Sequence, residues 1–455
     1  MTAPSRQLAF RLLERIGANR LHSDDAVNSP EMANLSILDR HMVTEIIYGV
    51  LRYRATLDWL LKAHSSCSWQ GIATSVKIIL RMSLYQLWKM DRVPDHALVN
   101  DAVEIAKRTS GPGVARYVNG ILRQLTRLRP WEEKDWLATA PEHVGVSLPP
   151  WLWTRWRKRF GRKMAREFAL SLLTPPLLVF RLHDRMADGL DDRLEHEADD
   201  PCLDYGFRKS EIVPGTYIAD RKSELTSHVG AYFQSAYFQS AYFQSAYFQD
   251  EASQMIPHLA GPLPSGSRVW DACAAPGGKS AILAGMMDES GVLVSSDMNP
   301  RRMEHLRGVL RDAAGALVLA ADARLAPPFR SGFDLVCADV PCSGIGTLRR
   351  NPEIKWRIQP GDLKTLQKTQ QQILHGVATA VRPGGRLLYS TCSTEPEENE
   401  QVVEDFLKIH ADFRLEAPAQ PAGMERWIGA DLMVRTFPGT RLWDGFFAAL
   451  LVRSR

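Results

Sequence analysis

The chain has 455 residues, of which 45% are hydrophobic and 24% are charged. This composition excludes a largely disordered protein and is sufficient for two or three domains with full hydrophobic cores. The formal net charge of +4 is mildly basic and favours an anionic partner only weakly. No apolar run approaches the length of a membrane span, and the basic start is explained without a transit peptide, so we expect a cytoplasmic protein.

The six cysteines predict neither a metal site nor a disulfide scaffold. They form no C-x-x-C pair, and no His/Cys cluster has the spacing of zinc ligands. Free thiols in a reducing compartment are the simplest interpretation. Four of the six are interpreted as small buried hydrophobes, namely Cys67, Cys202, Cys273 and Cys337.

Residues 1–130 are predicted to be helical, because apolar residues recur there at spacings of three and four. The first helix has an apolar face made by Leu8, Leu12, Leu13 and Ile16. Three more helices are expected at IIYGVLRYRATLDWLLKA, SVKIILRMSLYQLWKM and LVNDAVEIAKRT. Arginines recur on the polar faces, where RNA binding and simple solvation are equally good explanations; these are Arg52, Arg54, Arg116, Arg123, Arg127 and Arg129.

Residues 131–250 are predicted to form a linker and a small α+β module, with a boundary near the prolines of SLPPW. A basic helix, WLWTRWRKRFGRKMAREFALSLL, precedes the strand-like segments LLVFRLH and YGFRKSEIV. Trp151, Trp153 and Trp156 of this helix could stack on RNA. Packing against a neighbouring domain is the commoner fate of such tryptophans and is the favoured interpretation.

A pentapeptide repeat ends this region. AYFQS occurs three times between Ala231 and Ser245, and AYFQD follows at 246–250. The period of five matches no solenoid or heptad, and the uncharged aromatic composition is an aggregation hazard if exposed. We interpret the array as a tandem duplication accommodated in a surface loop, because added loop length costs little closure entropy. A functional aromatic platform is the alternative.

Residues 251–455 alternate between strand-like and helical segments. The expected strands are RVWDACA, GVLVSSD, ALVLAAD, FDLVCAD and GGRLLYSTC. This alternation predicts a doubly wound α/β domain, in which ligands bind beyond the carboxyl ends of the strands. The acids and cysteines that end several strands are therefore expected to converge on one crevice.

A glycine-rich turn joins the first of these strands to a helix, in VWDACAAPGGKSAIL at 269–283. Gly277 and Gly278 allow a ligand to approach the backbone, and the helix N-terminus with Lys279 favours a carboxylate or a phosphate. The turn differs from G-x-G-x-x-G and from a Walker loop, which argues against a nicotinamide-dependent oxidoreductase.

Asp297, Asp322 and Asp339 each end a predicted strand. Asp297 lies about twenty residues beyond the glycines, where an acid binds ribose hydroxyls in nucleotide-binding sheets. A single aspartate after a strand is more often a helix cap or a turn residue. Three in register with a glycine-rich turn favour a ligand site.

Cys342 and Cys392 each follow a core strand, in DVPCSGIGTLRRNPEIKW and YSTCSTEPEENE. Thr394 and Glu397, with Pro396 between them, predict a capping box that starts a helix just after Cys392. A helix N-terminus lowers the pKa of a thiol, whereas the nearby glutamates oppose that shift.

These groups match the needs of cytosine carbon-5 methylation. A thiolate that adds to carbon-6 makes carbon-5 nucleophilic, and an acid at ring nitrogen 3 stabilises the charge that develops there. Carbon-5 then takes a methyl group from a sulfonium donor, a base removes its proton and the thiol leaves. An acid, one nucleophilic thiol, one further group and a nucleoside-shaped cofactor pocket are the minimum set, and the sequence contains all of them.

The motifs DACAAPGGKS, DVPCSGIGTLRRNPEIKW and STCSTEPEENE resemble the Nop/Sun family of RNA 5-methylcytosine methyltransferases, in particular its bacterial RsmB-like subfamily. IIYGVLRYR and RYVNGILR resemble the NusB-like RNA-binding domain, so nearly the whole chain is covered. The resemblance implies an all-α NusB-like domain at 1–130, a small α+β RNA-binding module within 131–250 and a Rossmann-like S-adenosylmethionine-dependent methyltransferase domain at 251–455.

The resemblance also implies roles for individual residues. Cys392 matches the nucleophile, Cys342 the second cysteine that assists product release, and Asp339 the acid that contacts the cytosine edge. Asp297 resembles the ribose-binding acid, and Asp322 the acid near adenine. The implied S-adenosylmethionine-binding residues are Cys273, Ala274, Ala275, Pro276, Gly277, Gly278, Lys279, Asp297, Asp322 and Asp339.

The implied substrate is a cytosine of 16S ribosomal RNA, methylated on free RNA or an early small-subunit intermediate by a monomeric enzyme. Two departures from the family stand out: the AYFQS array replaces a single short segment, and Arg181-Leu182-His183 stands where R-V-N is usual.

Three alternatives remain open. The substrate could be a transfer RNA. The cysteine roles could be exchanged, because Cys342 follows Pro341 as the nucleophile of DNA cytosine methyltransferases follows a proline. The chain could also be an RNA-binding assembly or antitermination factor with an inactive catalytic domain, although its intact acids, glycines and cysteines argue against this.

Overall fold

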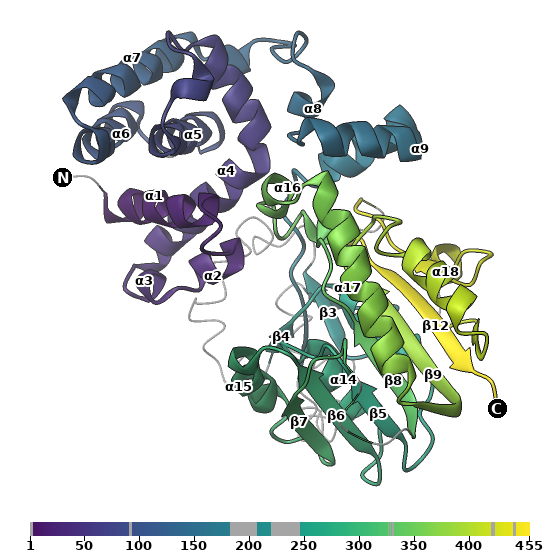
Figure 1. Cartoon of the computed structure of the whole chain (residues 1–455). Helices are drawn as coiled ribbons and strands as arrows, with labels where there is room; N and C mark the ends of the chain where they lie inside the picture. Colours follow the sequence, from purple (N-terminus) through teal and green to yellow (C-terminus); the bar gives the residue numbers. More distant parts are fainter. Residues whose placement is uncertain are drawn as a thin grey trace. The chain divides into compact units, whose positions relative to one another are not determined.

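The computed structural model describes residues 3–90, 93–182, 207–219, 246–325, 327, 329, 332–419, 424–439 and 443–455. These residues form two compact units, one helical and one built on two β-sheets (Figure 1). The helical unit contains the described residues up to Pro176 together with Leu348–Arg357, and the sheet unit contains the others. The predicted helical start and Rossmann-like end are confirmed. The division at residues 130 and 250 stays a prediction.

The helical unit follows the expected apolar periodicity. Its longest helix, α4, is capped by Ser36, whose hydroxyl accepts a hydrogen bond from the Asp39 amide at 3.1 Å. The helices are α1 Pro4–Gly17, α2 Ser23–Val27, α3 Pro30–Ala33, α4 Ile37–Ala63, η1 Trp69–Gly71, α5 Thr74–Lys89, α6 Asp95–Ser110, α7 Pro112–Leu128, η2 Pro130–Glu132, α8 Glu142–Gly145, α9 Pro150–Ser171 and α16 Ile354–Arg357.

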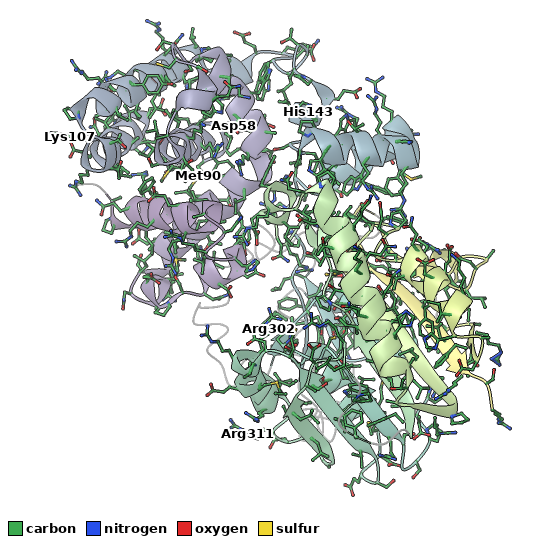
Figure 2. All side chains as sticks on the ribbon, viewed as in Figure 1. Asp58, Met90, Lys107, His143, Arg302 and Arg311 are labelled. Carbon is green, nitrogen blue, oxygen red and sulfur yellow. The ribbon has the colours of Figure 1, made fainter. Side chains whose placement is uncertain are left out.

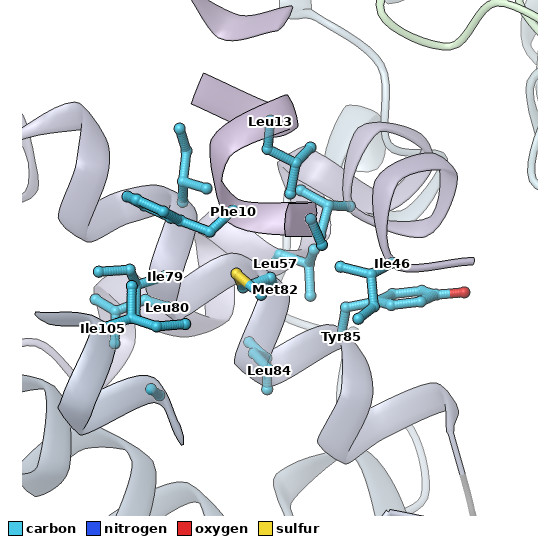
Figure 3. Close-up of a cluster of buried hydrophobic side chains, with 14 of the residues drawn as sticks. Phe10, Leu13, Ile46, Leu57, Ile79, Leu80, Met82, Leu84, Tyr85 and Ile105 are labelled. Atoms are coloured by element: carbon cyan, nitrogen blue, oxygen red, sulfur yellow. The ribbon is translucent and has the colours of Figure 1, made fainter. Parts of the chain in front are cut away.

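One hydrophobic core joins the N-terminal helices. Leu8, Leu12, Leu13 and Ile16 are at most 3% exposed, which confirms the predicted apolar face of α1. Each fully buried leucine contributes about 1.5–3 kcal/mol of hydrophobic stabilisation. Figure 3 shows part of this core, where side chains of α1, α4, α5 and α6 meet.

The predicted basic helix is α9, which Gly161 interrupts with a φ of 77°. Trp153 and Trp156 are 5% and 1% exposed, whereas Trp151 is half-buried. The first two tryptophans are therefore buried and cannot stack on RNA in this conformation, whereas their packing against a neighbouring domain stays a prediction.

The six arginines predicted to lie on polar faces fall into three groups, one of which, Arg54 and Arg129, is half-buried. Arg116, Arg123 and Arg127 of α7 are exposed, as expected. Arg52 of α4 is 5% exposed, and its guanidinium donates to the carbonyl of Arg349 at 3.2 Å. The prediction is therefore wrong for Arg52, because another segment covers that face of α4.

That segment is Leu348–Arg357, which includes α16. The amide and hydroxyl of Ser23 donate to the carboxylate of Glu353 at 3.2 and 2.6 Å. Lys355 and Trp356 donate to backbone carbonyls of α4 at 2.9 and 2.7 Å, and burial lowers the pKa of Lys355 well below its ordinary value. The motif RRNPEIKW is therefore part of the fold of the helical unit.

The smaller sheet of the other unit is antiparallel, in the order β2-β3-β1-β4. Both predicted strands of the middle region are present. The last pentapeptide copy, AYFQD, forms β4, so the surface-loop interpretation is wrong for this copy; the other three copies lie outside the described residues, as do Cys202 and His183. The strands are β1 Val179–Leu182, β2 Phe207–Lys209, β3 Thr216–Ala219 and β4 Ala246–Phe248.

The larger sheet has the order β10-β12-β9-β8-β5-β6-β7, with β11 paired to β12. Strands β5 to β9 are parallel, and all five expected strands are present. The chain runs outward from β5 to β7 and returns to β8 on the other side of β5, which creates a switch point between β5 and β8. The strands are β5 Arg268–Asp271, β6 Val292–Asp297, β7 Ala316–Ala320, β8 Phe333–Asp339, β9 Val381–Thr391, β10 Phe413–Leu415, β11 Val434–Arg435 and β12 Phe447–Arg453.

Helices cover both faces of the larger sheet, with α17 over β8 and β9 (Figure 1). Leu335 and Cys337 of β8 belong to one hydrophobic cluster, whereas the alternate Val336 and Ala338 belong to another. Within the described ranges, no helix is long and apolar enough to cross a membrane. The helices of this unit are α13 Glu251–His258, α14 Gly278–Gly285, α15 Pro300–Val309, η6 Ile345–Thr347, α17 Pro360–Ala378, α18 Glu400–Ile409 and η7 Glu425–Trp427.

Candidate active site

The candidate site lies at the carboxyl ends of the parallel strands, beside the switch point. β5 ends at Asp271, β6 at Asp297 and β8 at Asp339, and β9 ends one residue before Cys392. Because parallel strands end at one edge of the sheet, their terminal side chains face one crevice. A cavity of about 250 Å³ at this edge is lined by Asp297, Asp339 and both cysteines.

The two cysteines are in direct contact. The Sγ atoms of Cys342 and Cys392 are 3.0 Å apart, and the backbone amide of Cys392 donates to the Sγ of Cys342 at 3.3 Å. The hydrogen bond with Cys392, together with burial, raises the pKa of Cys342 well above its ordinary value. Cys342 therefore holds a proton next to the second sulfur at neutral pH.

The capping box predicted after Cys392 is absent. Residues Ser393 to Asn399 are irregular or in turns, and α18 begins only at Glu400. The hydroxyl of Thr394 donates to the carboxylate of Glu395 rather than capping a helix. The prediction is wrong, because the described residues that directly follow Cys392 begin no helix before Glu400.

Asp339 is held by two donors across the site. The ammonium of Lys279 donates to Oδ2 at 2.7 Å, and the hydroxyl of Ser390 donates to Oδ1 at 2.8 Å. Burial lowers the pKa of Lys279, but the charge and hydrogen bond of Asp339 outweigh it and hold that pKa above its ordinary value. The carboxylate is thus oriented and paired with a fixed positive charge.

The cavity extends from the cysteines to the ends of β6 and β7. Asp297 is 8% exposed, and its Oδ1 accepts the amide of Asn299 at 2.8 Å. Met298 and Ile373 are apolar lining residues, and Arg302 of α15, labelled in Figure 2, also lines the cavity. A buried acid beside apolar side chains suits a nucleoside, whose ribose is polar and whose base is flat.

Asp322 lies at the outer end of this cavity and forms an ion pair with Arg324 at 2.6 Å. The hydrogen bond from Arg324 lowers the pKa of Asp322. The guanidinium bonds to both carboxylate oxygens, so a ligand at Asp322 has to share them with Arg324.

The glycine-rich turn leads from β5 into α14. Gly277 caps the helix with a φ of 116°, a conformation that favours glycine. A Cβ on Gly278 would lie 2.7 Å from the ring of Tyr247, so a larger residue at this position would clash with β4. Behind the turn, the hydroxyl of Ser280 donates to Asp271 at 2.6 Å, and burial raises the pKa of Asp271 to about 6.

A second cavity, of about 240 Å³, lies between the glycine turn and β4. The predicted residues Cys273, Ala274, Ala275, Pro276, Gly278, Lys279 and Asp339 line it together with Tyr247, Phe248, Gln249, Ser253 and Asp271.

Sequence reasoning missed the contribution of β4 to this second cavity. The guanidinium of Arg181 lies 4.5 Å from the Tyr247 ring centroid and donates to Gln249 at 2.8 Å and to the Gly278 carbonyl at 2.7 Å. One signal marks this copy of the repeat: its fifth residue is Asp250, which caps α13 by accepting the amide of Ala252, where the other copies have serine.

The other three described cysteines differ in burial, although all were predicted to be buried hydrophobes. Cys337 is buried, as expected, and burial raises its pKa well above the ordinary value. Cys273 is half-buried and lines both cavities. Cys67 is exposed, so its interpretation as a buried hydrophobe is wrong; it lies in the short loop between α4 and η1.

Two family profiles match the chain. The profile described as "16S rRNA methyltransferase RsmB/F" matches residues 262–452, and the profile described as "NusB family" matches residues 3–127. The first range contains the cysteine pair, the glycine turn and the three strand-ending acids. The second contains helices α1 to α6 and nearly all of α7.

Curated relatives match almost the full length. "Probable ribosomal RNA small subunit methyltransferase B" of Bacillus subtilis (strain 168) is 31% identical over 90% of this chain and 89% of the relative. "Ribosomal RNA small subunit methyltransferase B" of Klebsiella pneumoniae subsp. pneumoniae is 29% identical over 99% of this chain and 98% of the relative. The crystal structure of the protein PH0851 has a TM-score of 0.75 at 23% identity and covers 99% of both chains, which establishes a common fold.

Proposed function

The chain belongs to the RsmB/F family of 16S rRNA methyltransferases, and we propose on that premise that it methylates carbon-5 of a cytosine in small-subunit ribosomal RNA through a covalent adduct with Cys392. Membership makes it a methyltransferase that uses S-adenosylmethionine. The covalent route is our proposal, and the contact between the Cys342 and Cys392 sulfur atoms is the observation that carries it.

The cavity residues fit the cofactor. Asp297 would bind the ribose hydroxyls, Met298 and Ile373 would contact the adenine, and the turn from Cys273 to Lys279 would hold the methionine end. Bound there, S-adenosylmethionine supplies an electrophilic methyl group. Asp322 would accept from the adenine amino group while it keeps its ion pair with Arg324.

Cys392 would attack carbon-6 of the cytosine, and Asp339 would contact the edge of the ring that gains electron density. Lys279 and Ser390 fix the orientation of that carboxylate before the substrate arrives. After methyl transfer, carbon-5 must lose its proton and the bond between carbon-6 and Cys392 must break. Cys342 contacts the Cys392 sulfur, so it would give its proton to that sulfur as the bond to carbon-6 breaks, and the resulting Cys342 thiolate would take the proton from carbon-5.

The raised pKa of Cys342 supports this assignment over the exchanged one. A thiol that keeps its proton is a poor nucleophile and a good partner for a neighbouring thiolate. The exchanged roles would require this protonated thiol to attack.

RNA would be bound in part by the helical unit, as the family-profile match suggests. Arg116, Arg123 and Arg127 lie exposed on α7 and provide positive charge for phosphate contacts. Free RNA or an early assembly intermediate, a monomeric enzyme and a cytoplasmic location are further parts of this proposal.

Bisulfite sequencing of RNA from cells with and without the gene tests the function. We expect one cytosine of 16S rRNA to lose its protection when the gene is deleted and to regain it on complementation. Lost protection in a transfer RNA instead would establish the alternative substrate. No change in any RNA, together with no binding of S-adenosylmethionine, would favour the inactive assembly factor.

A further inference from the structure

A buried carboxylate, Glu398, joins the two loops that contain the cysteines. Ser343 directly follows Cys342, and Ser393 directly follows Cys392. The hydroxyls of both serines donate to the same oxygen of Glu398, Oε2, each at 2.5 Å. Glu398 is fully buried, so this shared acceptor is shielded from water.

The other carboxylate oxygen holds the chain on both sides of Cys342. The backbone amide of Ser343 donates to Oε1 of Glu398 at 2.7 Å, and the Nε2 of Gln370 donates to the same oxygen at 3.0 Å. The same Gln370 nitrogen also donates to the carbonyl of Pro341 at 3.0 Å. Residues 341 and 343 are therefore anchored to one carboxylate, directly or through Gln370.

Glu398 is itself fixed to the sheet. Its backbone carbonyl accepts the hydroxyl of Tyr389, a β9 residue, at 2.5 Å. Burial of an ionisable group is costly unless donors satisfy it, and here four donors do so. No step of the proposed reaction uses this carboxylate as an acid, a base or a ligand.

We propose that Glu398 is a positioning residue that holds the Cys342 and Cys392 loops together and so keeps their sulfur atoms in contact. The importance of that contact for turnover rests on the proposed function, whereas the positioning itself does not. A glutamine at 398 keeps the size but has only one acceptor oxygen. It cannot accept from both serine hydroxyls on one side and from the Ser343 amide on the other.

Disulfide trapping measures the sulfur contact directly. Diamide takes two electrons and two protons from the thiols, is reduced to its hydrazine, and leaves an S–S bond between Cys342 and Cys392. We expect this bond to form about tenfold more slowly in E398Q than in the wild type, as judged by mass spectrometry of the linked peptides. E404Q is the matched control, because Glu404 is an exposed glutamate on the following helix, α18.

A trapping rate in E398Q within about twofold of the E404Q rate would overturn the proposal. If E398Q fails to fold, S343A and S393A each remove one arm of the network, and trapping must slow in both. Unchanged trapping in both variants would equally overturn it.

Steady-state kinetics separates positioning from general stabilisation. We expect kcat of E398Q to fall about tenfold while the KM for RNA and for S-adenosylmethionine stays within about twofold of wild type. A variant that loses cofactor affinity and activity in parallel would contradict a positioning role. A wild-type protein that methylates no RNA would contradict the proposed function instead, and disulfide trapping would still decide the role of Glu398.

Discussion

The loops after β8 and β9 occupy equivalent places in the sheet but give their cysteines different surroundings. Each loop contains a Cys-Ser pair, and both serines donate to Glu398. The Cys342 sulfur accepts the backbone amide of Cys392, and the pKa of this thiol is raised. In the sequence, the predicted capping box set Cys392 apart, whereas in the structure the amide contact and the raised pKa set Cys342 apart.

Serine substitutions give the largest expected effects and test this difference directly. C392S should lower kcat by about 10⁴-fold or more and form no covalent adduct, because the nucleophile is lost. C342S should also turn over slowly but accumulate a protein–RNA adduct, because the first bond still forms. Denaturing gels of enzyme incubated with labelled RNA and S-adenosylmethionine distinguish the two.

An adduct that accumulates in C392S and is absent in C342S would reverse the assignment of roles. Thermal unfolding of both variants is the control, since each serine keeps the size of the side chain and should leave the melting temperature close to that of the wild type.

D339N should lower kcat by about 10²–10³-fold, the scale of losing one oriented electrostatic contact in a transition state. The carboxylate lines the same cavity as both cysteines and is held by Lys279 and Ser390, so its loss affects the reacting ring whichever cysteine attacks. Single-turnover methylation with tritiated cofactor measures the effect. S-adenosylmethionine affinity, measured by calorimetry, should change far less, and an equal loss of affinity would instead place Asp339 chiefly in cofactor binding.

Much of the sheet unit could be predicted from its sequence, because its strands are short apolar runs that end in acids or cysteines. Asp297, Asp339, Cys342 and Cys392 all lie in the cavity at the carboxyl edge, where a parallel sheet must place them. The end of a strand can be predicted from the residues around it, because the apolar run that forms the strand stops there.

Other features depend on contacts between distant residues. The capping box predicted at Thr394 is absent. The side chains of Glu398 and Asn399 instead accept hydrogen bonds from residues next to the two cysteines, namely Ser343 and Thr391. Arg52 was placed on a polar face because nothing in its own helix indicates that Leu348–Arg357 covers it. The strand in the last pentapeptide copy was not predicted, because the four copies are nearly identical and the strand depends on pairing with the distant β1.

Alkylation by iodoacetamide tests the asymmetry of the thiols through pH. The hydrogen bond with Cys392 is the main cause of the raised pKa of Cys342, so C392A should lower that pKa toward its ordinary value. A lower pKa means that the reactive thiolate is present at lower pH. Near pH 9, Cys342 of C392A should therefore react about tenfold faster than Cys342 of the wild type for each unit of pKa recovered.

The matched control is Cys337, whose pKa is raised mainly by burial; its alkylation should be unchanged. An equal rate for Cys342 in both proteins would mean that burial alone suppresses its reactivity. The sulfur–sulfur hydrogen bond would then have no part in the difference between the loops.

The smallest expected effect concerns the hydrogen bonds that both cysteine loops make to Glu398. S343A and S393A should each lower the free energy of unfolding by about 1–2 kcal/mol, because each hydroxyl donates to Glu398 and also accepts a backbone amide, that of Ile345 or of Glu395. The double variant should lose about 1 kcal/mol more than the sum, because each single variant leaves Oε2 of Glu398 with one donor and the double variant leaves that buried oxygen with none. Urea unfolding of the full chain, monitored by tryptophan fluorescence, measures these free energies for the double-mutant cycle. Additive losses would mean that water or another donor replaces the serines, and that the two loops are independent despite their common acceptor.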